Sequence, residues 1–247
     1  MMAWLSLTDF RTQQDDIISR RQEGTGQWFL DSNEFKKWLQ GSKKTLFCPG
    51  IPGAGKTMIS AIVIDHLRRS TQTEDVGVAF LYCNYKAQAD QNVLNLLSAL
   101  LRQLVQSRPD IAAPVTEIYN TKRRSKPSID EIFRALQSVC SNYTTVYVVV
   151  DALDECTVEE GSRGLLIDKL CDLQSKAEDV QLLFTSRFIP DIARKFESSL
   201  TIEVRASEID VKRYVEGQMP RLPNCIQRDK ELKDAIKNKI AEVVDGM

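Results

Sequence analysis

The sequence has little that would direct the protein to a membrane or to nucleic acid. Its 33 Lys and Arg residues against 34 Asp and Glu residues leave a formal net charge of -1, which gives no basis for a nucleic acid or an anionic lipid surface as the default partner. Continuous apolar runs such as residues 146–150 fall far short of the roughly 20 residues of a membrane span. No basic segment precedes the apolar residues at the start of the chain. These absences predict a soluble, unexported protein of the cytoplasm.

Neither a disulfide scaffold nor a zinc site fits the cysteines. The six cysteines lie far apart in the chain and form no C-x-x-C pair. With 43% hydrophobic and 27% charged residues, the composition is that of an ordinary globular protein and excludes disorder. The basic run at residues 122–126 is interpreted as a solvated loop, so nucleic-acid binding has no strong signal. Small molecules and proteins remain as partners.

The chain does contain a repeated alternation of strand and helix patterns. We expect strands at residues 45–48, 78–82, 146–150, 182–184 and 202–204, with helical periodicity between them. Strands that alternate with helices predict an α/β fold with a parallel five-stranded sheet in three layers.

The segments on either side of these strands differ from them in pattern. The first twenty residues show poor periodicity, and then Asp31 or Ser32 caps a short helix that Gly41 ends. Ser207 and Asp210 open another helix beyond the last strand, and no further strand follows it. We therefore divide the chain into a lead-in at 1–40, a core at 41–206 and a partial helical subdomain at 207–247.

The strongest motif follows the first predicted strand. Residues 50–57 fit G-x-x-x-x-G-K-[ST] between a strand and a helix, which is the pattern of a phosphate-binding loop. Glycines let successive backbone N–H groups face phosphate oxygens, Lys56 bridges the terminal phosphates, and the Thr57 hydroxyl ligates Mg²⁺. The residues expected to hold the nucleotide here are Gly50, Ile51, Pro52, Gly53, Ala54, Gly55, Lys56, Thr57 and Met58.

Two further sets of polar residues follow predicted strands. Asp151 ends the apolar strand at 146–150, so it lies on the sheet edge where ligands of α/β folds bind and can hold the same Mg²⁺ as Thr57. Asp154 and Glu155 follow it at a spacing suited to orienting or deprotonating an attacking water. Arg187 ends another strand, where a guanidinium can contact a terminal phosphate, although a surface arginine in that position is equally common.

Together these motifs resemble the NACHT family of signal-transducing P-loop NTPases, particularly its fungal-type members with incompatibility or ankyrin-repeat architectures. The resemblance rests on residues 24–30, 48–57, 151–156 and 185–187. It implies a strand order of 5-1-4-3-2, a nucleotide-sensing role for Arg187, and an approach of Thr25 and Gly26 to the base. Members of that family continue into a winged-helix domain, whereas this chain stops at residues 245–247, so we expect part of the base-side wall and the lid to be absent.

The function predicted from these features is a nucleotide-dependent switch. In this hypothesis the protein binds Mg-ATP or Mg-GTP, hydrolyses it slowly, and regulates the conformation and self-assembly of a larger NLR-like signalling protein of innate immunity. A small-molecule kinase with the same loop and a nucleotide-binding scaffold without hydrolysis are the alternatives. The sequence does not distinguish ATP from GTP, and it assigns no acceptor pocket for a kinase.

Overall fold

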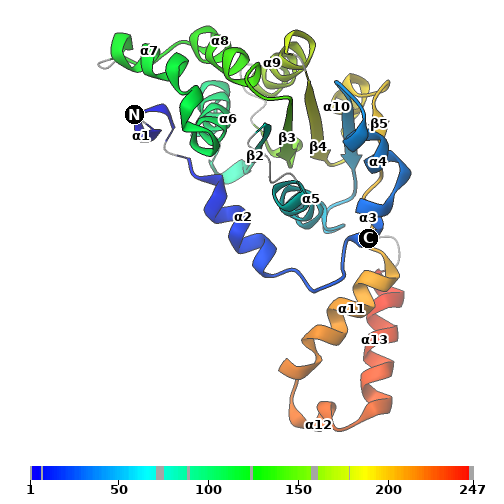
Figure 1. The fold of residues 1–247 in the computed structure, drawn as a ribbon. Helices are drawn as coiled ribbons and strands as arrows, with labels where there is room; N and C mark the ends of the chain where they lie inside the picture. Colours follow the sequence, from blue (N-terminus) through cyan, green and yellow to red (C-terminus); the bar gives the residue numbers. More distant parts are fainter. Residues whose placement is uncertain are drawn as a thin grey trace.

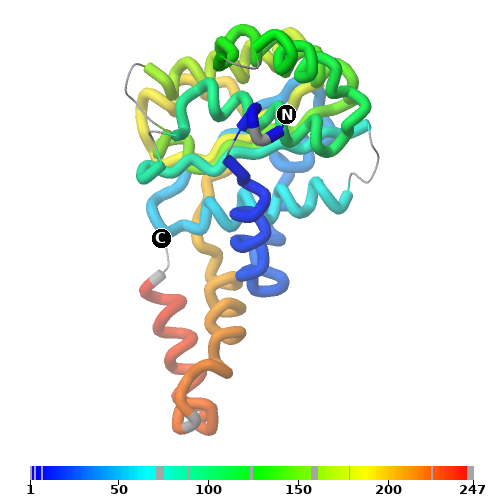
Figure 2. The backbone as a smooth tube through the Cα atoms, turned by 90° about the vertical axis from the view of Figure 1, so that its left-hand side faces the viewer, coloured from blue at the N-terminus to red at the C-terminus, as the bar shows by residue number. Residues whose placement is uncertain are grey.

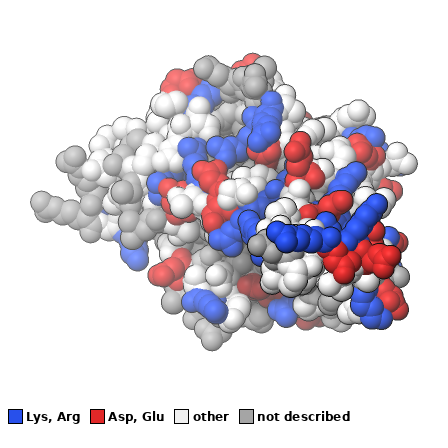
Figure 3. Space-filling view, turned by 90° about the horizontal axis from the view of Figure 1, so that it is seen from below, with Lys and Arg blue, Asp and Glu red and all other residues white. Residues whose placement is uncertain are grey.

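The computed structural model describes residues 2–6, 8–70, 75–87, 90–122, 125–156, 161–177 and 179–244. Arg123 and Arg124 of the basic run, and the chain end at 245–247, lie outside the described residues. Within the described ranges, no helix combines the length and the apolarity needed to cross a membrane. Figure 3 shows Lys and Arg side chains interspersed with Asp and Glu side chains over one face, in keeping with the balanced composition.

A five-stranded sheet with the order β2-β3-β4-β1-β5 forms the centre of the fold (Figure 1). Every neighbouring pair is parallel. This is the predicted order 5-1-4-3-2 counted from the other edge, so the α/β class and the order are both confirmed. The strands are β1 Thr45–Pro49, β2 Val76–Tyr82, β3 Thr145–Asp151, β4 Val180–Ser186 and β5 Leu200–Thr201.

Helices cover both faces of this sheet. Gln14 and Phe35 join α2 and α4 to α5 in one layer, whereas α6, α8 and α9 pack together in the opposite layer (Figure 1). The helices are α1 Met2–Leu5, α2 Phe10–Ser19, α3 Gln27–Asp31, α4 Asn33–Gln40, α5 Lys56–Ser70, α6 Val93–Ser107, α7 Ala113–Lys122, α8 Ile129–Cys140, α9 Ser162–Lys176, α10 Pro190–Lys195, α11 Glu208–Gln218, α12 Asn224–Gln227 and α13 Lys230–Val244. Short 3-10 turns are η1 Tyr85–Ala87, η2 Pro109–Ile111, η3 Leu153–Glu155 and η5 Met219–Arg221.

Figure 2 shows α11 and α13 running side by side away from the sheet. The two helices contact each other, and residues of both, including Val215 and Ile236, line one pocket together with Ile59 and Ile62 of α5. The predicted helical pattern after the last strand is therefore confirmed as a projecting helical hairpin. The division of the chain at residues 40 and 206 stays a prediction.

Helix α2 was not predicted, because its inward face carries a polar side chain. Asp9 caps this helix by accepting a hydrogen bond from the backbone N–H of Arg11. Gln14 is fully buried, donates to the Ala61 carbonyl at 2.9 Å and accepts from the Tyr82 hydroxyl. A buried glutamine breaks the apolar periodicity by which a helix is recognised.

The prediction for the fifth strand was displaced by two residues. The structure places β5 at Leu200–Thr201 rather than at 202–204. The chain continues alongside β1 beyond this strand, where Ile202 N–H donates to the Phe47 carbonyl at 3.0 Å and Val204 N–H to the Pro49 carbonyl at 2.7 Å. Residues 202–204 thus follow the edge of the sheet through hydrogen bonds outside the strand ladder.

Of the two helix starts predicted with a serine cap at Ser32 or Ser207, the structure shows a capping hydrogen bond at one. Ser32 caps α4 by accepting from the Phe35 N–H, and α4 ends before Gly41, as predicted. Ser207 precedes α11 but makes no capping bond with its side chain. Asp210 in the first turn of α11 instead accepts a hydrogen bond from the backbone N–H of Gly26, much earlier in the chain.

Candidate nucleotide-binding site

The loop between β1 and α5 has the backbone of a phosphate cradle. Gly53 and Gly55 have φ values of 83° and 90°, in the left-handed region that favours glycine. Lys56 begins α5, so the free N–H groups of a helix N-terminus lie directly after the turn. Gly50 is needed for a different reason, because a Cβ there would overlap the Val204 carbonyl oxygen. The glycine spacing of the motif thus serves both the turn and the contact with the edge of the sheet.

Lys56 lies across this loop. Its Nζ donates to the carbonyl oxygens of Gly50 and Ile51, each at 2.8 Å. Burial lowers the pKa of Lys56, and the carboxylates of Asp154 and Asp151 oppose that shift. The ammonium is therefore held inside the concave side of the loop, where an anion would replace the carbonyl contacts.

Asp151 is the buried carboxylate of the site, with 2% of its surface exposed at the end of β3. Its Oδ1 accepts from the Ser60 hydroxyl at 2.7 Å and from the Thr185 hydroxyl at 2.6 Å. Burial raises the pKa of Asp151, and the hydroxyl groups of Thr185, Ser60 and Thr57 partly offset the increase.

Thr185 holds this carboxylate in place from β4, the neighbouring strand. The Ala152 N–H donates to Thr185 Oγ1 at 2.9 Å, so the threonine hydroxyl proton is left to donate to Asp151. Ala152 itself has a φ of 53°, which turns the chain sharply after β3. The prediction that the strand carrying Thr185 lies between those carrying residues 50–57 and Asp151 is confirmed by the sheet order.

The hard oxygen ligands that Mg²⁺ prefers are present together here. Thr57 lies near enough to Asp151 to lower the pKa of its carboxyl group, and Mg²⁺ is usually held by one or two such groups together with water and substrate phosphates. Among the described residues there is no group of three or more His, Cys, Asp or Glu side chains that would form an all-protein metal cage. The residues present therefore fit Mg²⁺ bound with a nucleotide.

Asp154 and Glu155 lie in η3, directly after this turn. Arg187 donates to both oxygens of Asp154, through its backbone N–H at 2.9 Å and its Nε at 2.5 Å. This contact raises the pKa of Arg187. Glu155 Oε2 accepts from the Tyr85 N–H at 3.4 Å. The structure thus brings together all three residues predicted as catalytic, with Asp154 holding Arg187.

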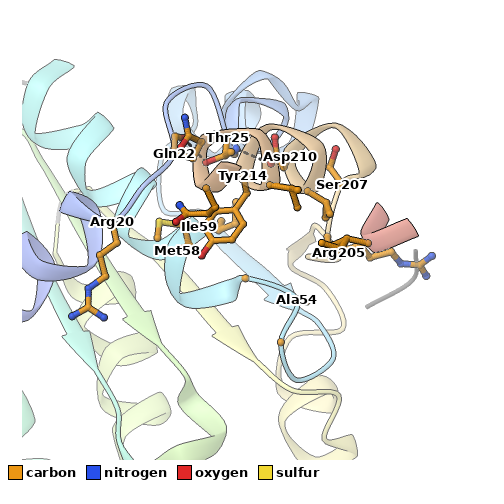
Figure 4. A pocket seen from close by; sticks show the side chains of 18 of the residues that line it. Arg20, Gln22, Thr25, Ala54, Met58, Ile59, Arg205, Ser207, Asp210 and Tyr214 are labelled. Carbon is orange, nitrogen blue, oxygen red and sulfur yellow. Dashed lines mark hydrogen bonds between the residues drawn. The ribbon is translucent and has the colours of Figure 1, made fainter. Parts of the chain in front are cut away.

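A mostly apolar pocket of about 520 Å³ adjoins the phosphate loop (Figure 4). Its volume falls in the usual range of small-molecule sites. Its walls come from the lead-in, the loop, the first turns of α5, and helices α11 and α13. The residues that line it include Thr25, Gly26, Trp28, Ala54, Met58 and Tyr214. The predicted base-contacting residues therefore line a cavity beside the phosphate loop, and two helices after residue 206 wall that side.

Asp210 is the residue of this pocket that sequence reasoning missed as a site residue. Its Oδ2 accepts from the Gly26 N–H at 2.8 Å and from the Trp28 Nε1–H at 3.1 Å. The sequence separations are 184 and 182 residues, so no local pattern links these positions. From the sequence, Asp210 is interpreted as an acidic residue that stabilises the start of a helix, so its contact with Gly26 and Trp28 is not predicted.

The comparisons with known proteins agree with this geometry. The family model described as nephrocystin 3, N-terminal, matches residues 24–187, which contain the strands β1 to β4 and every residue of the predicted site. The chain belongs to this family. The nephrocystin 3 N-terminal match begins at Gly24, next to the two residues predicted to approach the base, and it ends at Arg187.

One curated protein and one solved structure are similar to this member of the nephrocystin 3 N-terminal family. Vegetative incompatibility protein HET-E-1 of Podospora anserina is 23% identical over 236 residues, which cover 89% of this chain and 17% of that protein. The Walker-type ATPase PABY2304 of Pyrococcus abyssi superposes with a TM-score of 0.51 at 13% identity, over 86% of this chain and 60% of that one. The chain therefore spans less than two thirds of both proteins. The predicted resemblance to NACHT P-loop NTPases is confirmed, and the fold is that of a P-loop ATPase.

Proposed function

We propose that this protein is a nucleotide-dependent switch that binds Mg-ATP or Mg-GTP and hydrolyses it slowly. The observation that carries the proposal is the hydrogen bond from Ser60 to Asp151, which joins the helix that follows the phosphate loop to the end of β3. The carboxylate is thereby held beside the first turns of the helix that begins with Lys56 and Thr57, as binding of a nucleotide with its cation requires. The proposal extends to a signalling role in the cytoplasm, with self-association of a larger protein, and the similarity to an incompatibility protein supports the signalling part of it.

The roles of the remaining residues follow from their positions. When bound, Mg²⁺ would neutralise developing charge on the phosphates, with Thr57 and Asp151 as its protein ligands. The loop from Gly50 to Thr57 and Met58 would hold the phosphates through backbone N–H groups. Glu155 would orient the attacking water, while Arg187, held by Asp154, would contact the terminal phosphate. Thr25 and Gly26 would form part of the base site.

Titration of the purified protein with fluorescent ATP and GTP, with and without Mg²⁺, tests the binding step. Phosphate release measured with and without small-molecule acceptors then separates the classes of function. A hydrolytic switch releases phosphate without an acceptor, a kinase needs one, and a scaffold binds without release. Absence of binding to both nucleotides with Mg²⁺ present would reject the proposal.

A further inference from the structure

One face of α11 contacts the segment 22–28 along its whole length. We call residues 22–28 the strap. Asp210 accepts from the N–H groups of Gly26 and Trp28, and Arg213 Nη1 donates to the Gly24 carbonyl at 2.7 Å. A Cβ on Gly217 would overlap the Gln22 side chain. Positions 210, 213 and 217 recur at helical spacing, so successive turns of one helix face meet the strap.

The other side of the strap touches the phosphate-loop helix. Gly26 is buried with a φ of 74°, and a Cβ there would overlap the Ile62 side chain and lie 3.3 Å from Ile59 Cδ1. The Gly26 backbone therefore fits tightly between α5 and Asp210. The strap therefore lies between α5, which continues from the phosphate loop, on one side and α11 on the other.

Strap and α11 meet at the apolar pocket. Thr25, Gly26 and Trp28 line it from the strap, while Asp210 and Tyr214 line it from α11 (Figure 4). A single carboxylate oxygen of Asp210 accepts two of the three hydrogen bonds described between the strap and α11, and bonds to a charged acceptor are roughly twice as strong as neutral ones. At the pocket the base-side wall is thus held by one side chain that lies outside the phosphate loop.

We propose that Asp210 is a positioning residue for the nucleotide base, holding Thr25, Gly26 and Trp28 as one wall of the pocket and coupling α11 to its occupancy. The inference rests on the proposed function, because it needs the base in this pocket. A nucleotide that contacts both walls stabilises the contact between the strap and α11. Because coupling between two binding events is reciprocal, the contact between the strap and α11 in turn increases the affinity for the nucleotide.

The test compares ligands with and without a base. Calorimetry would measure the affinities for Mg-ATP, Mg-GTP and Mg-tripolyphosphate in wild type, Asp210→Ala and Asp210→Asn. We expect Asp210→Ala to weaken the tighter-binding nucleotide about tenfold and to leave tripolyphosphate within about twofold of wild type. Asp210→Asn should fall between wild type and Asp210→Ala, because its amide oxygen still accepts both bonds without the charge.

Glu208→Gln is the matched control. Glu208 lies on the same turn of α11 and its change removes the same charge, but its partner is Lys212 rather than the strap. It should bind all three ligands like wild type. Trp28→Phe is the second variant should Asp210→Ala fold poorly, since it removes only the indole donor and should reduce nucleotide affinity less than Asp210→Ala while sparing tripolyphosphate.

Each other outcome has a distinct meaning. Unchanged nucleotide affinity in Asp210→Ala, or an equal loss for tripolyphosphate, would overturn the positioning role alone. Equal losses in Asp210→Ala and Glu208→Gln would assign the effect to general electrostatics and would also overturn it. A wild-type protein that binds neither tripolyphosphate nor nucleotide would overturn the proposed function, and the role of Asp210 with it.

Discussion

Arg187 binds both carboxylate oxygens of Asp154, its backbone N–H donating to one and its Nε to the other. The Asp154 side chain is 2% exposed, whereas that of Arg187 is 50% exposed. The buried Asp154 carboxylate thus holds the backbone N–H and the Nε of Arg187, while the rest of the Arg187 guanidinium is exposed to solvent at the sheet edge. Because Arg187 follows β4 and Asp154 follows the adjacent β3, loss of a contact at one would be transmitted to the other.

This relationship separates the expected effects of the two neighbouring acids. Glu155→Gln should slow phosphate release by about 100-fold with nucleotide affinity within about twofold, because it removes the carboxylate proposed to orient the attacking water. Single-turnover hydrolysis alongside calorimetry would measure both quantities. Asp168→Asn is the control, because Asp168 pairs with Lys195 on the surface, and it should behave like wild type.

Asp154→Asn should also slow hydrolysis more than it weakens binding, by about tenfold, because it loosens Arg187 without removing it. Asp154→Asn combined with Arg187→Ala should then be no slower than Arg187→Ala alone. That double-mutant cycle measures whether the two act as a unit. Additive losses would mean that Asp154 acts on water directly and that the roles assigned here are wrong.

Lys56→Ala should abolish detectable Mg-nucleotide binding at ordinary protein concentrations while leaving the fold intact. Loss of a charged hydrogen-bond donor removes about 1.5–3 kcal/mol of binding free energy, whereas within the protein the Lys56 ammonium donates to the loop carbonyls of Gly50 and Ile51. Calorimetry gives the affinity and thermal unfolding gives the stability. Lys176→Ala, which removes a lysine paired with Asp172 on α9, is the matched control. Wild-type affinity in Lys56→Ala would refute the phosphate site.

The pH dependence of stability should report on Asp151. Burial raises the pKa of Asp151 in the folded state above its unfolded value. The folded state then binds more protons than the unfolded state above about pH 4, so this group makes the free energy of unfolding fall as pH rises through that window.

Asp151→Asn should remove this fall in the free energy of unfolding and be at least as stable as wild type at pH 7, yet lose the Mg²⁺ dependence of nucleotide binding. Urea unfolding between pH 4 and pH 7 measures this, with Asp172→Asn expected to keep the wild-type slope. An Asp151→Asn protein with that same slope would contradict the prediction.

Two glycines of the loop should respond differently to alanine. A Cβ on Gly50 meets the Val204 carbonyl oxygen, whereas a Cβ on Gly53 meets nothing within 4 Å. Gly50→Ala must therefore displace the chain beside β1, at a cost of about 1–3 kcal/mol in stability. Gly53→Ala pays only for its positive φ, about 1 kcal/mol, and should reduce phosphate binding more than stability. Equal unfolding free energies for the two variants would show that the contact with Val204 is easily relieved.

Local patterns determined much of this protein. The motif at 50–57 requires a strand before it and a helix after it, and the apolar run before Asp151 requires a buried strand, so the chemistry of both could be predicted from neighbouring residues. The strand order came from the resemblance to a family, because periodicity does not specify which strands become neighbours.

Tertiary structure decided the rest, since contacts between distant segments leave no periodic signal in either of them. In the sequence, Gln14 is a polar residue in a segment that is not predicted to be a helix. Its hydrogen bonds to the Ala61 carbonyl and from the Tyr82 hydroxyl appear only in the folded structure. Asp210 has the sequence position of an acid in the first turn of a helix, and only the folded structure shows that it binds Gly26, 184 residues earlier in the chain. The sequence by itself specified the phosphate loop and the carboxylates after β3, because each is formed by consecutive residues whose local backbone sets their geometry. Only the packing of α11 against the strap could show how the base-side wall is held, because a polar side chain's partner is chosen by the fold.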